Sequence, residues 1–358
     1  MWMYFVAAAP VVWLVVLLSS LYNCPQDKIT MSNFFDRCRQ QALYNAIGMK
    51  ANLDDLFNKR KNRFALPSNL KGRVVVITGG TRGIGVEVIR QLLKCDMQVV
   101  IGCRKVSAGE KVVEEIRKSG VETGTTKVFE CDTSTLDSTR NFAQKVLNSC
   151  PKVHILINNA GIMLVPYEET VDGHESQWQV NYLSHFLLTK LLLPRLEESA
   201  SNGLNSRIVN LSSSAHLGGK IDFDNLEMKK NYVSSTAYGT SKLAQLMFTK
   251  SLQRSFDARG APLQIHSVHP GVVNTDLFKG TYIDRMFPWM PRLLFKTPTE
   301  GATPVLYAAL SPDIEGKACS YISNCSEYPV LDEANDVEKQ DKLFEISCKD
   351  VGVEKFTP

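Results

Sequence analysis

A tyrosine and a lysine four residues apart, Tyr238 and Lys242, could carry out proton chemistry, because residues i and i+4 share one face of a helix. A nearby ammonium group favours the phenolate form of a tyrosine, whose ordinary pKa of about 10 is otherwise too high for proton exchange near neutrality. A carbonyl reduction needs such a proton on oxygen together with a hydride on carbon. The pair alone is commonplace on helices, so the rest of the chain must decide whether it is catalytic.

A run of glycines follows the first apolar strand-like segment of the chain. Residues 73–79, RVVVITG, read as a buried strand, and Gly79, Gly83 and Gly85 stand between it and an amphipathic helix. A tight turn needs residues without a Cβ, and the N-terminus of the helix offers N–H groups and the positive end of a dipole to phosphates. Because the glycines lie between a β-branched strand and a helix, they predict a dinucleotide-binding site.

Apolar runs of strand length alternate with segments of helix length over most of the chain. The six runs lie at 73–79, 97–103, 126–132, 154–160, 206–213 and 263–271. Continuously apolar strands are buried on both faces, so their alternation with helices predicts a parallel sheet covered on both sides. With right-handed crossovers this is a doubly wound, Rossmann-like α/β fold in a single catalytic domain. A short last strand near 319–324 and a helix with Thr297 as its N-cap complete the prediction.

Three motifs occur in the order expected of one enzyme family. They are the G-x-x-x-G-x-G spacing at 79–85, NNAG at 158–161 and Y-x-x-x-K at 238–242. Together they resemble the short-chain dehydrogenase/reductase superfamily, over about residues 71–330. The segments NYLSHFLLT and HPGVVNTDLFK are similar to its retinol-dehydrogenase-like branch, and within that branch to the X-linked group, which is linked to long isoprenoid alcohols and aldehydes. The resemblance implies an NAD(P)-dependent dehydrogenase/reductase acting on CH–OH groups.

The resemblance also implies a catalytic set of four residues. Tyr238 would exchange a proton with the substrate oxygen, and Lys242 would assist it and bond the cofactor ribose. Ser213, 25 residues before Tyr238, would hold the substrate oxygen, and its serine neighbours leave that assignment open by one position. A main-chain group at Asn181, in a helix bend, would hold a water that links the lysine to solvent. The expected set is Asn181, Ser213, Tyr238 and Lys242.

The cofactor would extend from the glycine loop to the turn after the sixth strand. By the resemblance, Asp132 would lie by the adenine amino group, the NNAG segment under the ribose on the nicotinamide side, and Thr275 at the carboxamide. Besides Tyr238 and Lys242, the expected cofactor-binding residues are Gly79, Thr81, Arg82, Gly83, Ile84, Gly85, Arg104, Lys105, Asp132, Asn159, Ala160, Gly161, Pro270, Gly271 and Thr275.

The end of the second strand indicates which dinucleotide binds. NAD-preferring relatives place an acidic residue there, which holds the ribose 2′-hydroxyl. Here the strand is followed by Arg104 and Lys105, and Arg82 lies in the glycine loop. Guanidinium groups form bidentate hydrogen bonds with phosphate, so these residues predict NADP(H) as the preferred cofactor. NAD(H) is the alternative if the basic residues only solvate the start of a helix.

The first 22 residues carry no charged side chain and are long enough, at ~1.5 Å rise per residue, to cross a hydrocarbon layer of ~30 Å. Residues 23–73 then contain ten Lys/Arg and four Asp/Glu. The positive-inside rule favours a single-pass anchor in the endoplasmic reticulum membrane with the body in the cytosol, over the cleaved signal peptide of a secreted or luminal protein. Residues 23–70 are expected to be a basic linker of short amphipathic helices, either lying on the bilayer or packed on the body as a tether.

Residues 282–296 are expected to form the substrate lid, and nine of these fifteen are aromatic, Ile, Leu or Met. An apolar lid beside a membrane anchor predicts a lipophilic alcohol, aldehyde or ketone drawn from the lipid bilayer, with long-chain isoprenoids first and retinoids or steroids as alternatives. A lid packed on the body, or a dimer contact, is the plainer interpretation. A non-catalytic membrane adaptor that retains the fold is the alternative from another functional class.

Composition limits the other functions that the chain could have. It has 358 residues, of which 44% are hydrophobic, and a net charge of +4, as expected of a globular protein. No zinc-finger spacing or basic-aromatic repeat points to nucleic acid, and nine Cys without a CxxC pair predict buried thiols and no metal site. The polar tail at 331–358 has no functional assignment, and a homodimer is as open as a monomer.

Overall fold

The computed structural model describes residues 31–200, 204–279, 281, 285, 289–317 and 321–354. The apolar segment expected to span a membrane, residues 1–22, lies outside these residues, as do six residues of the expected lid, at 282–284 and 286–288. Across the part of the chain that is described, no helix combines the length and the apolar character needed to cross a membrane.

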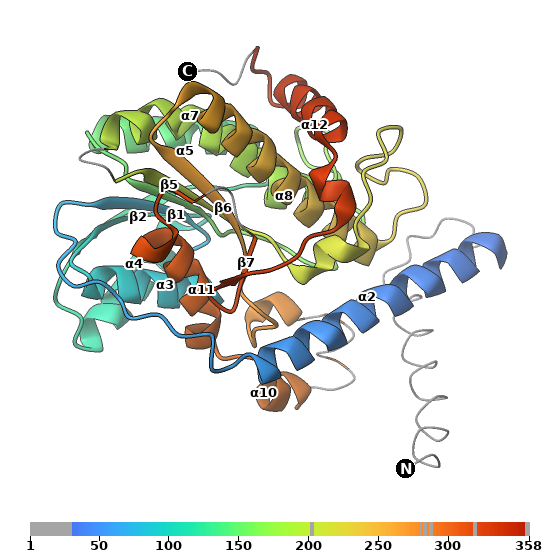
Figure 1. The fold of residues 1–358 in the computed structure, drawn as a ribbon, viewed down its shortest axis with the longest axis horizontal. Helices are drawn as coiled ribbons and strands as arrows, with labels where there is room; N and C mark the ends of the chain where they lie inside the picture. The colour runs from blue at the N-terminus through green and yellow to red at the C-terminus, as the bar shows by residue number, and fades with distance from the viewer. Residues whose placement is uncertain are drawn as a thin grey trace.

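The centre of the fold is an eight-stranded sheet in the order β3-β2-β1-β4-β5-β6-β7-β8 (Figure 1). Neighbouring strands pair in parallel except β8, which pairs antiparallel with β7 at the sheet edge. The bounds are β1 Val74–Thr78, β2 Gln98–Cys103, β3 Thr125–Glu130, β4 Ile155–Asn158, β5 Ser206–Leu211, β6 Leu263–His269, β7 Tyr321–Ser323 and β8 Ser326–Glu327. The first six strands match the six apolar runs to within one residue at their starts, so the doubly wound parallel sheet is confirmed.

Helices cover both faces of this sheet (Figure 1). One face packs against α3 (Gly83–Lys94), α4 (Val106–Lys118) and α11 (Pro298–Leu310). The other packs against α5 (Leu136–Ser149), α7 (Ser184–Ser199) and α8 (Ser234–Arg259). Thr297 caps α11 in a capping box with Glu300, as predicted.

The two faces of the sheet make two separate hydrophobic cores because successive strand residues point to opposite sides. Val74 and Val76 of β1 pack into the core with α5, α7 and α8. Val75 and Ile77 pack into the other core with α3, α4 and α11. All four are essentially inaccessible to solvent, which explains why the strands read as unbroken apolar runs.

The C-terminal segment belongs to the packed body. Helix α12 (Val337–Asp350) lies on α8, and Leu343, Cys348 and Val351 are buried in the same core as α7 and α8. Two polar residues of this helix, Gln340 and Ser347, are buried with them. The tail up to residue 354 therefore contributes apolar burial, which stabilises the fold by about 25 cal/mol per Å² of apolar area.

Residues Met31–Phe57 form one continuous helix of 27 residues, α2, so the expectation of several short helices was wrong. Its sequence contains no proline, and a single glycine, Gly48, costs only about 1 kcal/mol relative to alanine in a helix interior. Tertiary packing along one face offsets that cost. Helix α2 runs along one side of the body (Figure 1) and packs on α8 and on the 3₁₀ turn η2 (Ser214–Gly218).

A buried ion pair fixes the C-terminal end of α2. Asp55 Oδ1 lies 2.9 Å from Lys296 Nζ, and both side chains are more than nine-tenths buried. Asp55 Oδ2 accepts a hydrogen bond from the Val272 N–H at 2.9 Å, and Asn324 bonds both members of the pair, at 3.1 and 2.7 Å. Removing one partner of such a pair typically destabilises a protein by about 3–5 kcal/mol. The pair therefore holds α2 to the loop that follows β6.

Candidate active site

The strand order reverses between β1 and β4, and open α/β sheets bind ligands at such a point, beyond the carboxyl ends of the strands. The glycine loop after β1 and the NNAG segment after β4 meet there. Gly79 has φ +75°, and a Cβ on it would lie 2.8 Å from Ala160 Cα. A Cβ on Gly85 would overlap the Gly79 carbonyl oxygen. The loop is therefore shaped by positions where no side chain fits.

The N-terminus of α3 faces the same edge of the sheet. Arg82 stands at its N-cap with extended backbone, and its side chain makes no capping hydrogen bond. The N–H groups of a first helical turn left without a side-chain cap can bind an anion. The residues present at this edge therefore fit the pyrophosphate of a dinucleotide.

Asn159 supports the glycine loop through its side chain. Its Nδ2 donates to the carbonyl oxygens of Thr78 and Gly79, at 2.8 and 2.9 Å. The N–H groups of Asn159 and Ala160 donate to Thr78 Oγ1, at 3.1 and 3.0 Å. Asn159 was expected under the ribose; the structure shows that its amide also sets the shape of the loop.

A buried chain of hydrogen bonds continues from Thr78 and was missed by sequence reasoning. Thr78 Oγ1 already accepts two N–H groups, so its own hydrogen points to His185 Nε2, 2.9 Å away. His185 Nδ1 then carries a hydrogen and donates to the Asn181 carbonyl oxygen at 3.1 Å. Burial lowers the pKa of His185 to about 4, so the ring is neutral and both nitrogens have partners. The sequence signal was the i, i+4 spacing of Asn181 and His185.

Asn181 lies in the π-helical turn η1 (Gln179–Leu183), which precedes α7. Its Oδ1 accepts the Ile162 N–H at 2.9 Å, and its Nδ2 donates to Ser241 Oγ at 3.0 Å. The side chain thus joins the segment after NNAG to the helix that carries Tyr238 and Lys242. π-turns are frequent at functional sites, and the helix bend expected at Asn181 is present.

Tyr238 and Lys242 lie on one face of α8, buried next to the end of β5. Lys242 Nζ is 5.8 Å from the centre of the Tyr238 ring. It donates to the Leu211 carbonyl oxygen at 2.7 Å and to Gln245 Oε1 at 3.1 Å. A Cβ on Gly161 would lie 3.8 Å from Lys242 Nζ and 3.2 Å from Asn181 Oδ1, which places these groups around one point.

Of the three neighbouring serines after β5, Ser213 is the one that hydrogen-bonds the Tyr238 phenol. Ser213 Oγ also accepts the Ala215 N–H at 3.1 Å at the start of η2. Ser212 is turned away and donates to the Lys242 carbonyl oxygen at 3.0 Å. The four residues of the expected catalytic set therefore lie together, with Ser213 beside the phenol.

Burial shifts the two titratable groups of this set in opposite directions. It raises the pKa of Tyr238 to about 12, against the effect of the Ser213 hydrogen bond, which lowers it. It lowers the pKa of Lys242 to about 7. A low dielectric disfavours the charged form of each group, so a further charge in the site is needed for the phenol to lose its proton near neutrality.

Two more of the expected cofactor residues, Thr275 and Asp132, lie at the same edge of the sheet. Thr275 caps the 3₁₀ turn η3 (Asp276–Phe278), and a Cβ on Gly83 would lie 3.0 Å from its Cγ2. Asp132 follows β3, and its Oδ1 accepts from the N–H and the hydroxyl of Ser134, at 3.0 and 2.8 Å. The loop after β1 and the loop after β6 therefore touch across the site.

Three basic side chains stand at the outer end of this rim. Arg82 lies in the glycine loop, and Arg104 and Lys105 follow β2. All three are exposed, and within the described residues none has a carboxylate within ion-pair distance. Their positive charges are therefore available to a ligand at the end of β2.

Fold and site together define a class, the dinucleotide-dependent oxidoreductases with a Tyr–Lys pair. The family model for short chain dehydrogenases matches residues 73–285, and the chain belongs to that family. Retinol dehydrogenase 12 of Mus musculus is 41% identical over 285 residues, covering 80% of this chain and 88% of that protein. Polyprenol dehydrogenase of Homo sapiens is 38% identical over 317 residues, covering 86% and 94%. The chain is thus an NAD(P)-dependent short-chain dehydrogenase/reductase of the retinol-dehydrogenase-like branch.

A solved structure shares the fold. The crystal structure of an uncharacterised protein from Mycobacterium paratuberculosis superposes with a TM-score of 0.66 at 33% identity, covering 82% of this chain and 97% of that one. Helix α2 precedes the matched family segment, so the family model alone gives no account of it.

The pKa of Lys242 predicts how cofactor binding depends on pH. With a pKa of about 7, the amine is mostly neutral at pH 8, and the negative phosphates of NADPH favour its ammonium form. Binding at pH 8 should therefore take up a proton, and affinity should fall as pH rises above 7, by up to about tenfold per pH unit. Calorimetry in buffers of different ionisation enthalpy measures this uptake.

Two variants separate this effect from general electrostatics. Lys242→Met should bind NADPH without proton uptake, whereas Lys250→Met, two turns further along α8, should behave like the wild type. Uptake that persists in Lys242→Met would assign the proton to another group.

Proposed function

We propose that this protein is a membrane-anchored, NADP(H)-dependent oxidoreductase that interconverts a lipophilic alcohol with its aldehyde or ketone, with long-chain isoprenoids of the polyprenol type as its substrate class. The observation that carries the proposal is the apolar surrounding of the Tyr238 phenol. Buried around it are side chains from the loop after β4 and from η2, with aromatic and aliphatic groups from α2 and η3 packed against them. The members are Met163, Leu164, Ala215 and Tyr238, with Tyr44, Leu277 and Phe278.

Such a surrounding suits an apolar substrate with one reactive polar end. When bound, NADPH supplies a hydride to the carbonyl carbon. The Tyr238 phenol donates its proton to the carbonyl oxygen, and the Ser213 hydroxyl holds that oxygen by a hydrogen bond. Lys242, as an ammonium, stabilises the phenolate that remains, and Asn181 fixes the helix turn beside it.

The names of the relatives support a lipophilic alcohol as the substrate class, but they do not distinguish polyprenols from retinoids. The polyprenol dehydrogenases are 38% identical to this chain, and the retinol dehydrogenases are 36–41% identical. A polyprenol-type aldehyde is long and slim, whereas retinal carries a ring, so retinoids and steroid ketones are the second candidates. A non-catalytic membrane adaptor that retains the fold is the candidate from another class.

Replacing the phenol tests the catalytic proposal. Tyr238→Phe should still bind NADPH through the other expected cofactor residues and lose turnover by about 10²–10⁴-fold, because the proton donor is gone and the ring packing remains. Purified protein in micelles is assayed for NADPH oxidation with a polyprenal, retinal and a steroid ketone. Tyr307→Phe, on α11 and packed on Phe64, is the matched control and should stay fully active. Equal turnover in Tyr238→Phe would show that Tyr238 is not the proton donor. No turnover by the wild type with any carbonyl would favour the adaptor.

The exposed basic rim supports NADP(H) over NAD(H). Arg104→Ala should reduce kcat/KM with NADPH by about 10-fold or more, because a charge-assisted hydrogen bond to the 2′-phosphate is lost, and should leave the value with NADH nearly unchanged. Lys94→Ala, at the far end of α3, controls for net charge. A parallel loss with both cofactors would mean that Arg104 only supports the fold.

The outer face of α2 supports contact with a membrane. Its exposed side chains include a stripe of large apolar residues, and basic residues lie within and just after it. The apolar residues are Phe35, Leu43, Met49, Leu53, Leu56 and Phe57; the basic ones are Arg39, Lys50, Lys59, Arg60 and Lys61. Apolar and basic groups on one helix face suit an anionic bilayer surface. Trp289 and Leu293, in the described part of the lid, add to the exposed apolar surface.

The proposed orientation places the body on the cytosolic side of the endoplasmic reticulum, against the alternative of a secreted or luminal protein. In intact microsomes that contain the full chain, added protease should therefore digest the body without detergent, while a luminal marker protein resists. A body that is protected until detergent opens the vesicles would reverse the orientation.

A further inference from the structure

Helix α2 lies against the reaction site. We propose that α2 forms one wall of the substrate site and that Tyr44 on it is a specificity-determining residue, which limits the width of the substrate beside the reacting carbonyl. The inference rests on the proposed function, because it concerns which lipophilic carbonyls reach Tyr238. It assigns a role to a residue outside the matched family segment at 73–285.

Tyr44 belongs to the apolar cluster around the catalytic phenol. Its side chain packs against the cluster that contains Met163, Ala215 and Tyr238, and its hydroxyl donates to Met163 Sδ at 3.4 Å. Met163 lies two residues after Gly161, on the loop that leaves the cofactor edge. Tyr44 thus connects the loop after β4 with the side chains around the Tyr238 phenol. It lies 119 residues from Met163 in the sequence, so this contact joins distant segments of the chain.

Contacts on both sides of Tyr44 hold this part of α2 over the site. Gln40 Oε1 accepts a hydrogen bond of 2.7 Å from Thr236 Oγ1, two residues before Tyr238. One turn further along, a Cβ on Gly218 of η2 would lie 3.3 Å from Ile47 Cδ1. Both contacted elements carry or adjoin catalytic residues: α8 carries Tyr238, and η2 follows Ser213 directly.

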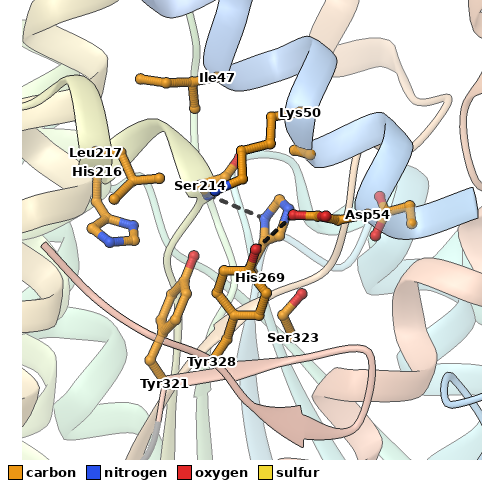
Figure 2. A pocket seen from close by; sticks show the side chains of 12 residues that line it. Ile47, Lys50, Asp54, Ser214, His216, Leu217, His269, Tyr321, Ser323 and Tyr328 are labelled. Atoms are coloured by element: carbon orange, nitrogen blue, oxygen red, sulfur yellow. Dashed lines mark hydrogen bonds between the residues drawn. The ribbon is translucent and has the colours of Figure 1, made fainter. Parts of the chain in front are cut away.

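A small cavity separates the next turns of α2 from the residue after Ser213. Figure 2 shows Ile47, Lys50 and Asp54 of α2 on one side, and Ser214 and His269 on the other. The Ser214 N–H donates to His269 Nδ1 at 3.3 Å. Helix α2 therefore faces the serine loop along at least two of its turns, and the contact is not confined to Tyr44.

The buried Asp55–Lys296 pair fixes the far end of the same helix. It ties α2 to the Val272 N–H, within the loop that runs from Pro270 to Thr275, and to the residue that precedes Thr297 of α11. With contacts at Gln40, Tyr44 and Asp55, α2 is attached to the site over four turns. A side chain held this firmly presents a fixed shape to a substrate.

The size of Tyr44 should therefore decide how broad a group can lie next to the carbonyl. On this proposal, the aromatic ring that packs on Met163 admits only a slim chain beside the carbonyl. Removing it opens space where a cyclic group can enter, and pockets discriminate such shape differences by about 10–200-fold. The hydroxyl contributes a weak bond to sulfur, so the ring, and not the hydroxyl, should set the preference.

The test compares a slim and a broad aldehyde in the full chain in micelles, with NADPH. Farnesal serves as the slim isoprenoid aldehyde and retinal as the broad one. Tyr44→Ala should raise the ratio of kcat/KM for retinal over farnesal by about tenfold or more, and should leave the KM for NADPH within about twofold. Tyr44→Phe should keep the wild-type ratio. Tyr307→Ala, which removes an equal ring from α11, should also keep it, and circular dichroism confirms that each variant is folded.

The outcomes separate the two proposals. A wild type that turns over both aldehydes, with an unchanged ratio in folded Tyr44→Ala, overturns the role of Tyr44 and leaves the oxidoreductase proposal standing. An equal shift of the kcat/KM ratio for retinal over farnesal in Tyr307→Ala also overturns the role of Tyr44, because the shift would then come from a general destabilisation of the fold. A wild type that binds NADPH and turns over neither aldehyde, nor any other carbonyl, overturns the proposed function and this inference with it.

Discussion

The burial of the Lys242 amine is the constraint on which the site depends. An ammonium group inside a protein is costly unless hydrogen-bond acceptors replace water, and here the Leu211 carbonyl oxygen and Gln245 do so. Both acceptors come from the framework: Leu211 ends β5, and Gln245 lies on α8 itself. The pKa of about 7 shows that this compensation is incomplete, so the charge of the amine responds to what binds beside it. A fully solvated lysine would stay charged and could not couple ligand binding to the proton state of Tyr238.

The edge of the sheet where the cofactor is expected is shaped by positions that exclude any side chain and by hydrogen bonds to the backbone, more than by charged side chains. Gly79 and Gly85 lie where a Cβ would collide with neighbouring backbone. The side-chain amide of Asn159 donates hydrogen bonds to the carbonyl oxygens of the loop. The neutral His185 then connects Thr78 to the main chain of Asn181, which joins the glycine loop to the π-helical turn. These groups satisfy one another's hydrogen bonds, which preorganises the edge for a ligand.

Most of the fold could be predicted from the sequence because it depends on local signals, and the four residues of the expected catalytic set, named from a family resemblance, lie together in the structure. Unbroken apolar strands, glycines at a strand-to-helix turn and an i, i+4 pair are readable over a few residues. The predictions that failed or were missing depend on contacts between distant segments. One long helix replaced the expected short ones because packing on η2 and α8 selects the continuous form. Neither the Tyr44–Met163 contact nor the Asp55–Lys296 pair leaves a pattern in the sequence, since each partner is an ordinary residue at its own position.

Helix α2 has apolar side chains on two opposite faces, so its sequence shows only a weak amphipathic pattern. Its inner face carries Tyr44, Ile47 and Asp55 toward the site, and its outer face carries Met49, Leu53 and Phe57 toward solvent. A helix with apolar groups on two opposite faces has little net polarity difference between them. Apolar residues on both faces are explained if each face contacts a different partner. On the proposed orientation, those partners are the substrate site and the bilayer. A lipophilic substrate would then leave the membrane beside the helix that carries Tyr44, whose ring is proposed to lie next to the reacting carbonyl. The distance that the substrate must travel through water is therefore short.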